Sequence, residues 1–112
     1  MEIVPRYKFD QMVSDALDAL PAELLPVLDN VVVQVHDRNP DEPDLLGLYE
    51  GTPHTERWGD EAPDQISIYR HTLCESCDDL DQLADEIHVT VIHEVAHAAG
   101  IDDERLHELG WA

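Results

Sequence analysis

The segment HEVAHAAGIDD, residues 93–103, contains two histidines four positions apart, with a glutamate directly after the first. In an α-helix, residues four apart lie one above the other on the same face, so His93 and His97 can both reach one ion. Glu94 is rotated by about 100° from His93 and lies beside such an ion. A general base that takes a proton from metal-bound water needs that position. The spacing therefore predicts a metal site on a helix, with His93 and His97 as ligands and Glu94 as the catalytic base.

The sequence around this motif predicts a long and mostly buried helix. Its apolar residues recur at steps of four, at Leu83, Ile87, Val91 and Val95. We expect Asp81 to be the N-cap and the helix to run to about Ala99. Gly100 adopts the left-handed conformation without steric cost, so it ends the helix and reverses the chain.

The reversal brings a third ligand candidate back toward the two histidines. We expect this ligand to be Asp103, which gives two imidazoles, one carboxylate and an open position for water, as a catalytic zinc requires. Asp102 is one residue away and competes for the role, but we expect it to cap a short helix over residues 103–109. Weaker ligand candidates are Glu104, His107 and Glu108.

The rest of the chain predicts an α+β protein with a small sheet and helices packed on one face. We expect helices over residues 7–20 and 81–99, a short turn at 22–28, strands over 30–36, 45–50 and 65–70, and a loop over 71–79. We interpret the strand over 65–70 as an edge strand that could hold an extended peptide by strand addition.

Composition and charge exclude several classes of partner. The 112 residues include 26 Asp and Glu but only 6 Lys and Arg, for a formal net charge of −20. Phosphate neutralisation needs clustered basic residues, so nucleic acid is not the expected partner, and neither is an anionic membrane surface. No segment approaches the roughly 18 apolar residues of a membrane span, and the first residues lack the features of a signal peptide. We therefore expect a cytoplasmic protein, of undetermined oligomeric state.

Other chemically interesting residues have plainer interpretations. Cys74 and Cys77 form a C-x-x-C, but a redox role needs a βαβ context, and a second zinc site with His71 lacks a fourth ligand. We expect two loop cysteines in a reducing compartment. We expect His54, Arg57 and Trp58 to lie in a solvated loop. We expect Tyr49 and Tyr69 to occupy half-buried strand positions, and His88 to lie away from the metal. Arg105 and His107 are candidate oxyanion donors, but no spacing rule places them at the site.

Beyond the motif itself, residues 93–111, HEVAHAAGIDDERLHELGW, resemble the small bacterial zincin-like family of minimal metallopeptidase-like proteins, with their HExxHxxGxxD pattern. The similarity extends to VVVQV at 31–35, LLGLYEG at 45–51 and QISIYR at 65–70, which look like the strands of that family in the same order. The resemblance covers most of the chain.

This resemblance implies a minimal zincin-like fold over residues 1–112 as a single domain, with a small mixed sheet of about three to four strands. It also implies a zinc site at His93, His97 and Asp103, with Glu94 as the catalytic glutamate. The family does not indicate a natural substrate.

The function that these features favour is a zinc-dependent hydrolase, in particular a peptidase that acts on a peptide or protein. The alternative is a metal-stabilised binding module that retains the site without efficient proteolysis. Metzincins use His as third ligand and have a Met-turn, whereas this chain has Asp103 at that position and both methionines far upstream. Only nine residues follow Asp103, too few for a C-terminal wall of a substrate cleft. The retained Glu94 favours the enzyme.

Overall fold

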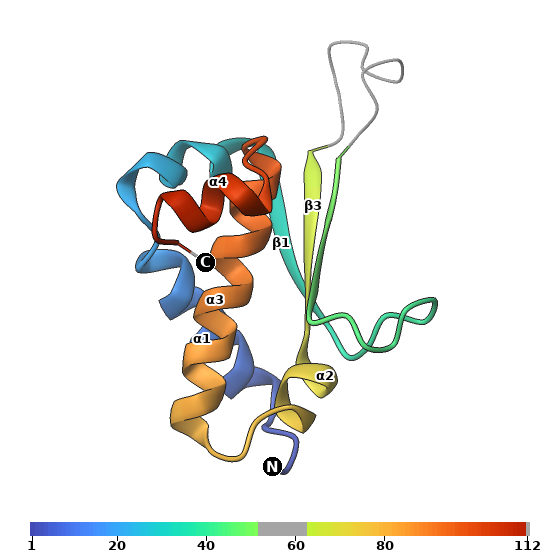
Figure 1. Ribbon diagram of the computed structural model, residues 1–112. Coiled ribbons are helices and arrows are strands. Elements are labelled where there is room, and N and C mark those ends of the chain that lie inside the picture. The colour runs from blue at the N-terminus through green and yellow to red at the C-terminus, as the bar shows by residue number, and fades with distance from the viewer. Residues whose placement is uncertain (52–62, 112) are drawn as a thin grey trace.

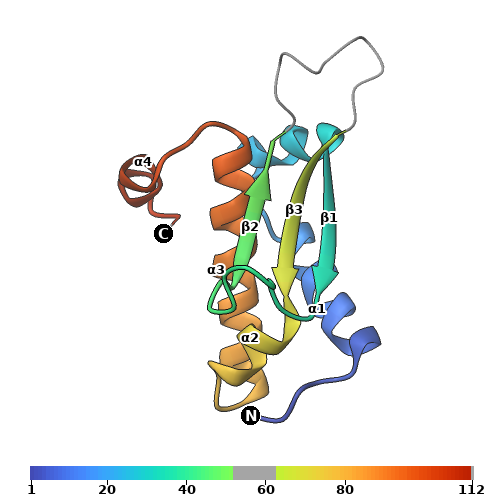
Figure 2. The same ribbon diagram turned by 90° about the vertical axis from the view of Figure 1, so that its right-hand side faces the viewer.

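A mixed β-sheet lies against a layer of helices in the computed structural model, which describes residues 1–51 and 63–111 (Figure 1). The elements in chain order are α1 (Arg6–Asp18), the 3-10 helix η1 (Ala22–Asn30), β1 (Val31–His36), β2 (Gly47–Glu50), β3 (Asp64–Tyr69), α2 (Arg70–Glu75), α3 (Leu80–Ala98) and α4 (Asp103–Glu108). The view in Figure 2 shows β1, β2 and β3 in front of α1 and α3. The expected α+β class, with a small mixed sheet and helices on one face, is confirmed.

The strand order among the described residues is β1-β3-β2, so β3 is the central strand. It pairs in parallel with β1, where Val33 faces Ile66, and antiparallel with β2, where Tyr49 faces the same residue. The expectation that residues 65–70 form an edge strand is therefore wrong. Ile66 and Ile68 alternate as in a half-buried strand, but Ser67 and Tyr69 are buried on the other face as well.

The two edge strands differ in what borders them. On β1, the Arg6 guanidinium of α1 donates a hydrogen bond to the carbonyl of Val35 over 2.6 Å. On β2, the outer edge pairs with no strand of the described residues. Because α3 contacts β2, this open edge lies beside the same helix that carries the two motif histidines.

Helix α3 forms the centre of the hydrophobic core, as its apolar pattern predicts. The four apolar residues that recur at steps of four are each at most 1 % exposed; they are Leu83, Ile87, Val91 and Val95. The expected N-cap was wrong, because Asp79 rather than Asp81 accepts a hydrogen bond from the backbone N–H of Gln82, over 2.8 Å. The helix therefore begins at Leu80, and Asp81 lies exposed in its first turn.

The segment expected to be a loop at residues 71–79 instead begins with helix α2. Its first residue, Arg70, donates from its guanidinium to the carbonyl of Val4 over 2.8 Å and to the carboxylate of Asp37 over 2.9 Å. Leu73 and Cys74 of the same helix are fully buried. Long-range contacts therefore stabilise this short helix, which has no strong pattern of its own. None of the helices described here is long and apolar enough to cross a membrane.

Candidate metal centre

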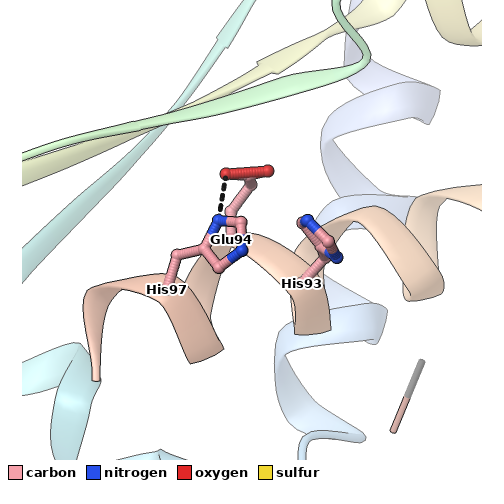
Figure 3. A group of neighbouring side chains, drawn as sticks. All are labelled: His93, Glu94 and His97. Atoms are coloured by element: carbon pink, nitrogen blue, oxygen red, sulfur yellow. Dashed lines mark ion pairs between the residues drawn. The ribbon is translucent and has the colours of Figure 1, made fainter. Parts of the chain in front are cut away.

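The last turns of α3 bring His93, Glu94 and His97 together, as the helical spacing predicts (Figure 3). One potential ligand atom from each residue lies within 4.8 Å of the other two. The two imidazole rings meet edge-on, with centroids 4.2 Å apart. Among the described residues, donor atoms of His and Glu gather here into a group that could hold a metal ion.

Gly100 reverses the chain directly after the histidines. It has a φ of +80°, and its N–H donates to the backbone carbonyl of His97 over 3.0 Å. The N–H of Ile101 donates to the carbonyl of Ala96 over 2.9 Å. These two bonds are those of a Schellman motif, which turns the backbone sharply at a helix end. The predicted role of Gly100 is confirmed.

The reversal places Asp103 against both imidazoles. Its Oδ1 atom lies 2.9 Å from Nε2 of His97 and 3.3 Å from Nε2 of His93. The hydrogen bond with His97 is the main reason why the pKa of Asp103 lies below its usual value. The four residues that meet here, His93, Glu94, His97 and Asp103, are those that the sequence predicts.

The types of these donors and their closeness fit a zinc site. Zinc bound to imidazole nitrogen and carboxylate oxygen at about 2.0–2.1 Å keeps neighbouring ligand atoms about 3.4 Å apart. The distance from Asp103 to Nε2 of His93, 3.3 Å, matches this separation, while the distance to Nε2 of His97, 2.9 Å, is that of a hydrogen bond. Two imidazoles and one carboxylate are also the donor types of a catalytic zinc site with one open position.

Asp102 is occupied elsewhere, as expected. Its side chain accepts a hydrogen bond from the N–H of Arg105 over 2.8 Å and caps α4. Arg105 in turn forms an ion pair with Glu108 over 2.9 Å. The weaker ligand candidates Glu104 and His107 are exposed on α4 and do not join the cluster.

Glu94 is held between the helix and the sheet. It is 8 % exposed, and its Oε1 atom lies 3.5 Å from Nδ1 of His97. On its other side, a Cβ atom added at Gly47 of β2 would lie 3.1 Å from Cγ of Glu94 and 2.8 Å from Cγ2 of Thr90. Gly47 is not among the site residues predicted from the sequence. A glycine within a strand pattern marks a close backbone approach and could have revealed it.

A groove of about 340 Å³ begins at His93 and Glu94. Its further lining comes from α3, from the segment before β2 and from the first residue of β2, namely Glu86, Val89, Thr90, Asp44, Leu45, Leu46 and Gly47. The two sides of the groove are some forty positions apart in the sequence, so no local pattern predicts it.

Both cysteines belong to the core, and only one of them lies in a loop. Cys74 belongs to α2, against expectation, and is fully buried, whereas Cys77 lies in the loop after that helix, as expected, at 1 % exposure. Burial also raises the pKa of the Cys77 thiol. Within the described chain, His71 does not gather with them into a metal-binding group.

The remaining candidates have structural positions. Tyr69 is buried at 4 % exposure rather than half-buried as expected, and its hydroxyl accepts from Asn39. Tyr49 is half-buried, as expected, and its hydroxyl donates to Asp64 over 2.7 Å. His88 lines a different hollow, against Met12 and Ala16 of α1. The loop residues His54, Arg57 and Trp58 lie outside the described residues.

A sequence model of the zincin-like metallopeptidase family matches residues 28–111, which include all three strands and the helix with the cluster. The chain belongs to the zincin-like metallopeptidase family. Membership confirms the resemblance in the sequence and implies zinc binding and peptidase chemistry. No curated protein matches the chain.

Proposed function

We propose that this protein is a zinc-dependent peptidase. The observation that carries the proposal is the meeting of one Asp103 oxygen with Nε2 of both His93 and His97, beside the buried carboxylate of Glu94. Zinc would be held by His93, His97 and Asp103. When bound, zinc lowers the pKa of a coordinated water to about 7 and polarises a carbonyl group.

Glu94 is the general base in this proposal. Its carboxylate accepts a proton from the attacking water and later gives a proton to the leaving amine. The residue is 8 % exposed and packs against the backbone of Gly47, which restricts where the carboxylate can move. General acid–base catalysis of this kind contributes about 10²- to 10⁴-fold to a rate.

The substrate in this proposal is a peptide or protein segment that lies along the open edge of β2. The N–H of Tyr69 donates to the carbonyl of Leu46 over 3.0 Å, so the backbone of Leu46 faces β3. Successive residues of an antiparallel strand point their backbone groups in opposite directions, so Gly47 faces away from β3. A peptide added at this edge would lie beside Glu94, because Gly47 contacts that residue.

One observation favours a second function, the metal-stabilised binding module. Glu94 lies 3.5 Å from Nδ1 of His97, where a carboxylate can orient a ligating imidazole. On this view Glu94 supports metal binding and takes no proton from water.

The substitution Glu94→Gln separates the two functions. Glutamine keeps an acceptor oxygen for His97 but cannot take up a proton. We expect the variant to bind zinc nearly as well as the original chain and to lose about 10²- to 10⁴-fold in peptide hydrolysis. The matched control is Glu104→Gln, which changes an exposed carboxylate of α4 and should leave both properties unchanged.

Both measurements are made on the same preparations, by elemental analysis and by mass-spectrometric detection of cleaved peptides. Unchanged hydrolysis in Glu94→Gln would exclude Glu94 as the base. Zinc binding without cleavage of any peptide in a broad library would favour the binding module. A His93→Ala, His97→Ala double variant with undiminished zinc content would refute the metal site itself.

A further inference from the structure

The groove that adjoins the candidate metal centre has two kinds of lining. Its apolar part comes from Leu45, Leu46 and Val89, and Val89 is 45 % exposed. Two acidic residues, Asp44 and Glu86, also line the groove. Neither carboxylate forms an ion pair or a side-chain hydrogen bond with a described residue.

The position of the groove connects it to the site. His93 and Glu94 line one part of it, while Glu86 lies seven residues earlier on α3. Seven residues of α-helix span about 10 Å along the axis. A side chain that starts from a peptide at His93 must therefore be long to approach Glu86.

The volume also limits what the groove can accept. At about 340 Å³ it lies at the lower end of the range for small-molecule pockets, about 300–1,000 Å³. This is room for a side chain rather than for a folded partner. An apolar floor with acidic groups suits a side chain that combines an aliphatic stem with a positive end, as Lys and Arg do.

We propose that this groove is a specificity subsite for a lysine or arginine side chain of the peptide substrate. The aliphatic stem packs on Leu45, Leu46 and Val89, and the cationic end meets Glu86 and Asp44. The inference rests on the proposed peptidase function, because it assumes a peptide bound at the β2 edge.

The alternative explanation is the overall charge of the chain. With a net charge of −20, any basic peptide is attracted wherever its lysines lie. The groove makes two sharper demands. The basic residue must occupy one fixed position relative to the cleaved bond, and its stem must be long enough to reach Glu86.

The test is the mapping of cleaved bonds in a peptide library with zinc-loaded protein, followed by matched peptides that carry lysine, norleucine or the shorter 2,4-diaminobutyrate at the preferred position. We expect lysine to be favoured over both others. The substitution Glu86→Gln should lower the advantage of lysine about threefold to fivefold, in line with a partly exposed ion pair. The control Glu23→Gln changes net charge equally but touches an exposed residue of η1 outside the groove, and should leave the advantage intact.

The outcomes separate this subsite from the peptidase function. Cleavage without a positional preference, an equal effect of Glu23→Gln, or equal cleavage of the diaminobutyrate peptide would overturn the subsite while the peptidase function stands. If no peptide is cleaved, the peptidase function fails, and the groove is tested by binding alone. In that case Nα-acetyl-lysine amide, whose side-chain ammonium is free, should shift the NMR signals of the Leu46 and Val89 amides more than Nα-acetyl-norleucine amide does. Equal shifts would overturn the subsite.

Discussion

Replacing Gly47 by alanine tests how closely the sheet approaches the candidate metal centre. The added Cβ would lie 2.8 Å from Cγ2 of Thr90, 3.1 Å from Cγ of Glu94 and 3.3 Å from the carbonyl oxygen of Ser67. Carbon atoms in contact prefer separations of about 3.5–4.0 Å, so β2 or α3 has to shift. Thr90 is 6 % exposed and β-branched, and it cannot simply swing into solvent.

The expected magnitude follows from two opposing effects. A glycine-to-alanine change at an ordinary backbone conformation stabilises by about 0.4–1 kcal/mol, because it restricts the unfolded chain. Overpacking a filled site costs about 1–3 kcal/mol. We therefore expect Gly47→Ala to lower the free energy of unfolding by about 1–2 kcal/mol. Displacement of Glu94 should also lower hydrolysis, by up to about 10²-fold.

The assay is urea unfolding of the metal-free protein in a double-mutant cycle with Thr90→Ser. That second change removes Cγ2, the nearest atom, and by itself costs about 0.8 kcal/mol for the lost buried carbon. The free energy of unfolding of the double variant should be at least about 1 kcal/mol higher than the value expected if the two single effects were additive. Additive effects, or a Gly47→Ala protein as stable as the original, would refute this account of the contact.

Three further predictions concern other parts of the molecule. Asp103→Ala should weaken zinc affinity more than Asp102→Ala does, and zinc titration of both variants measures this. Asp102→Ala should instead destabilise the metal-free protein by about 1 kcal/mol in urea unfolding, because the α4 cap is lost. A larger loss of zinc affinity in Asp102→Ala than in Asp103→Ala would make Asp102 the better ligand. The Arg70 guanidinium beside Asp37 lowers the pKa of Asp37 below its usual value of 3.8. The stabilisation of the folded state by the ionised Asp37 is therefore present above pH 3.8 and is lost as the pH falls through the lowered pKa. The stability difference between the original chain and Asp37→Asn should therefore narrow from about pH 6 to about pH 3, and a constant difference in urea unfolding would contradict this. Cys77 should react with iodoacetamide far more slowly in the native protein than in urea, because burial removes access and raises its pKa; equal labelling rates would contradict its burial.

The candidate site could be predicted from the sequence because its geometry is local. The separation of His93 and His97 is set by the helical repeat, and the return of Asp103 is set by Gly100 three residues after His97. All of these positions fall within eleven consecutive residues, so no knowledge of the tertiary structure is needed. The apolar stripe that buries α3 is also a local property.

The predictions from the sequence were wrong or incomplete where contacts between residues far apart in the chain determine the structure. Strand order depends on pairing between segments far apart, which placed β3 at the centre rather than at an edge. Helix α2 depends on the contacts of Arg70 with Val4 and Asp37. Asp79 and Asp81 are equally good capping residues, and only the hydrogen bond to Gln82 distinguishes them. Gly47 was missed because its neighbour Glu94 lies 47 positions later in the chain.

Helix α3 carries the centre of the core on one face and the candidate metal centre on another, which links the ion to the amount of folded protein. An ion that binds the native state but not the unfolded chain adds about 1.4 kcal/mol of stability for every tenfold rise in its free concentration above the dissociation constant. If the centre binds zinc as proposed, the melting temperature of the purified chain would serve as a gauge of zinc occupancy. The zinc-free fraction in a cell would then unfold more often and be removed by proteases. Zinc supply would in this way set the abundance of the protein as well as its activity.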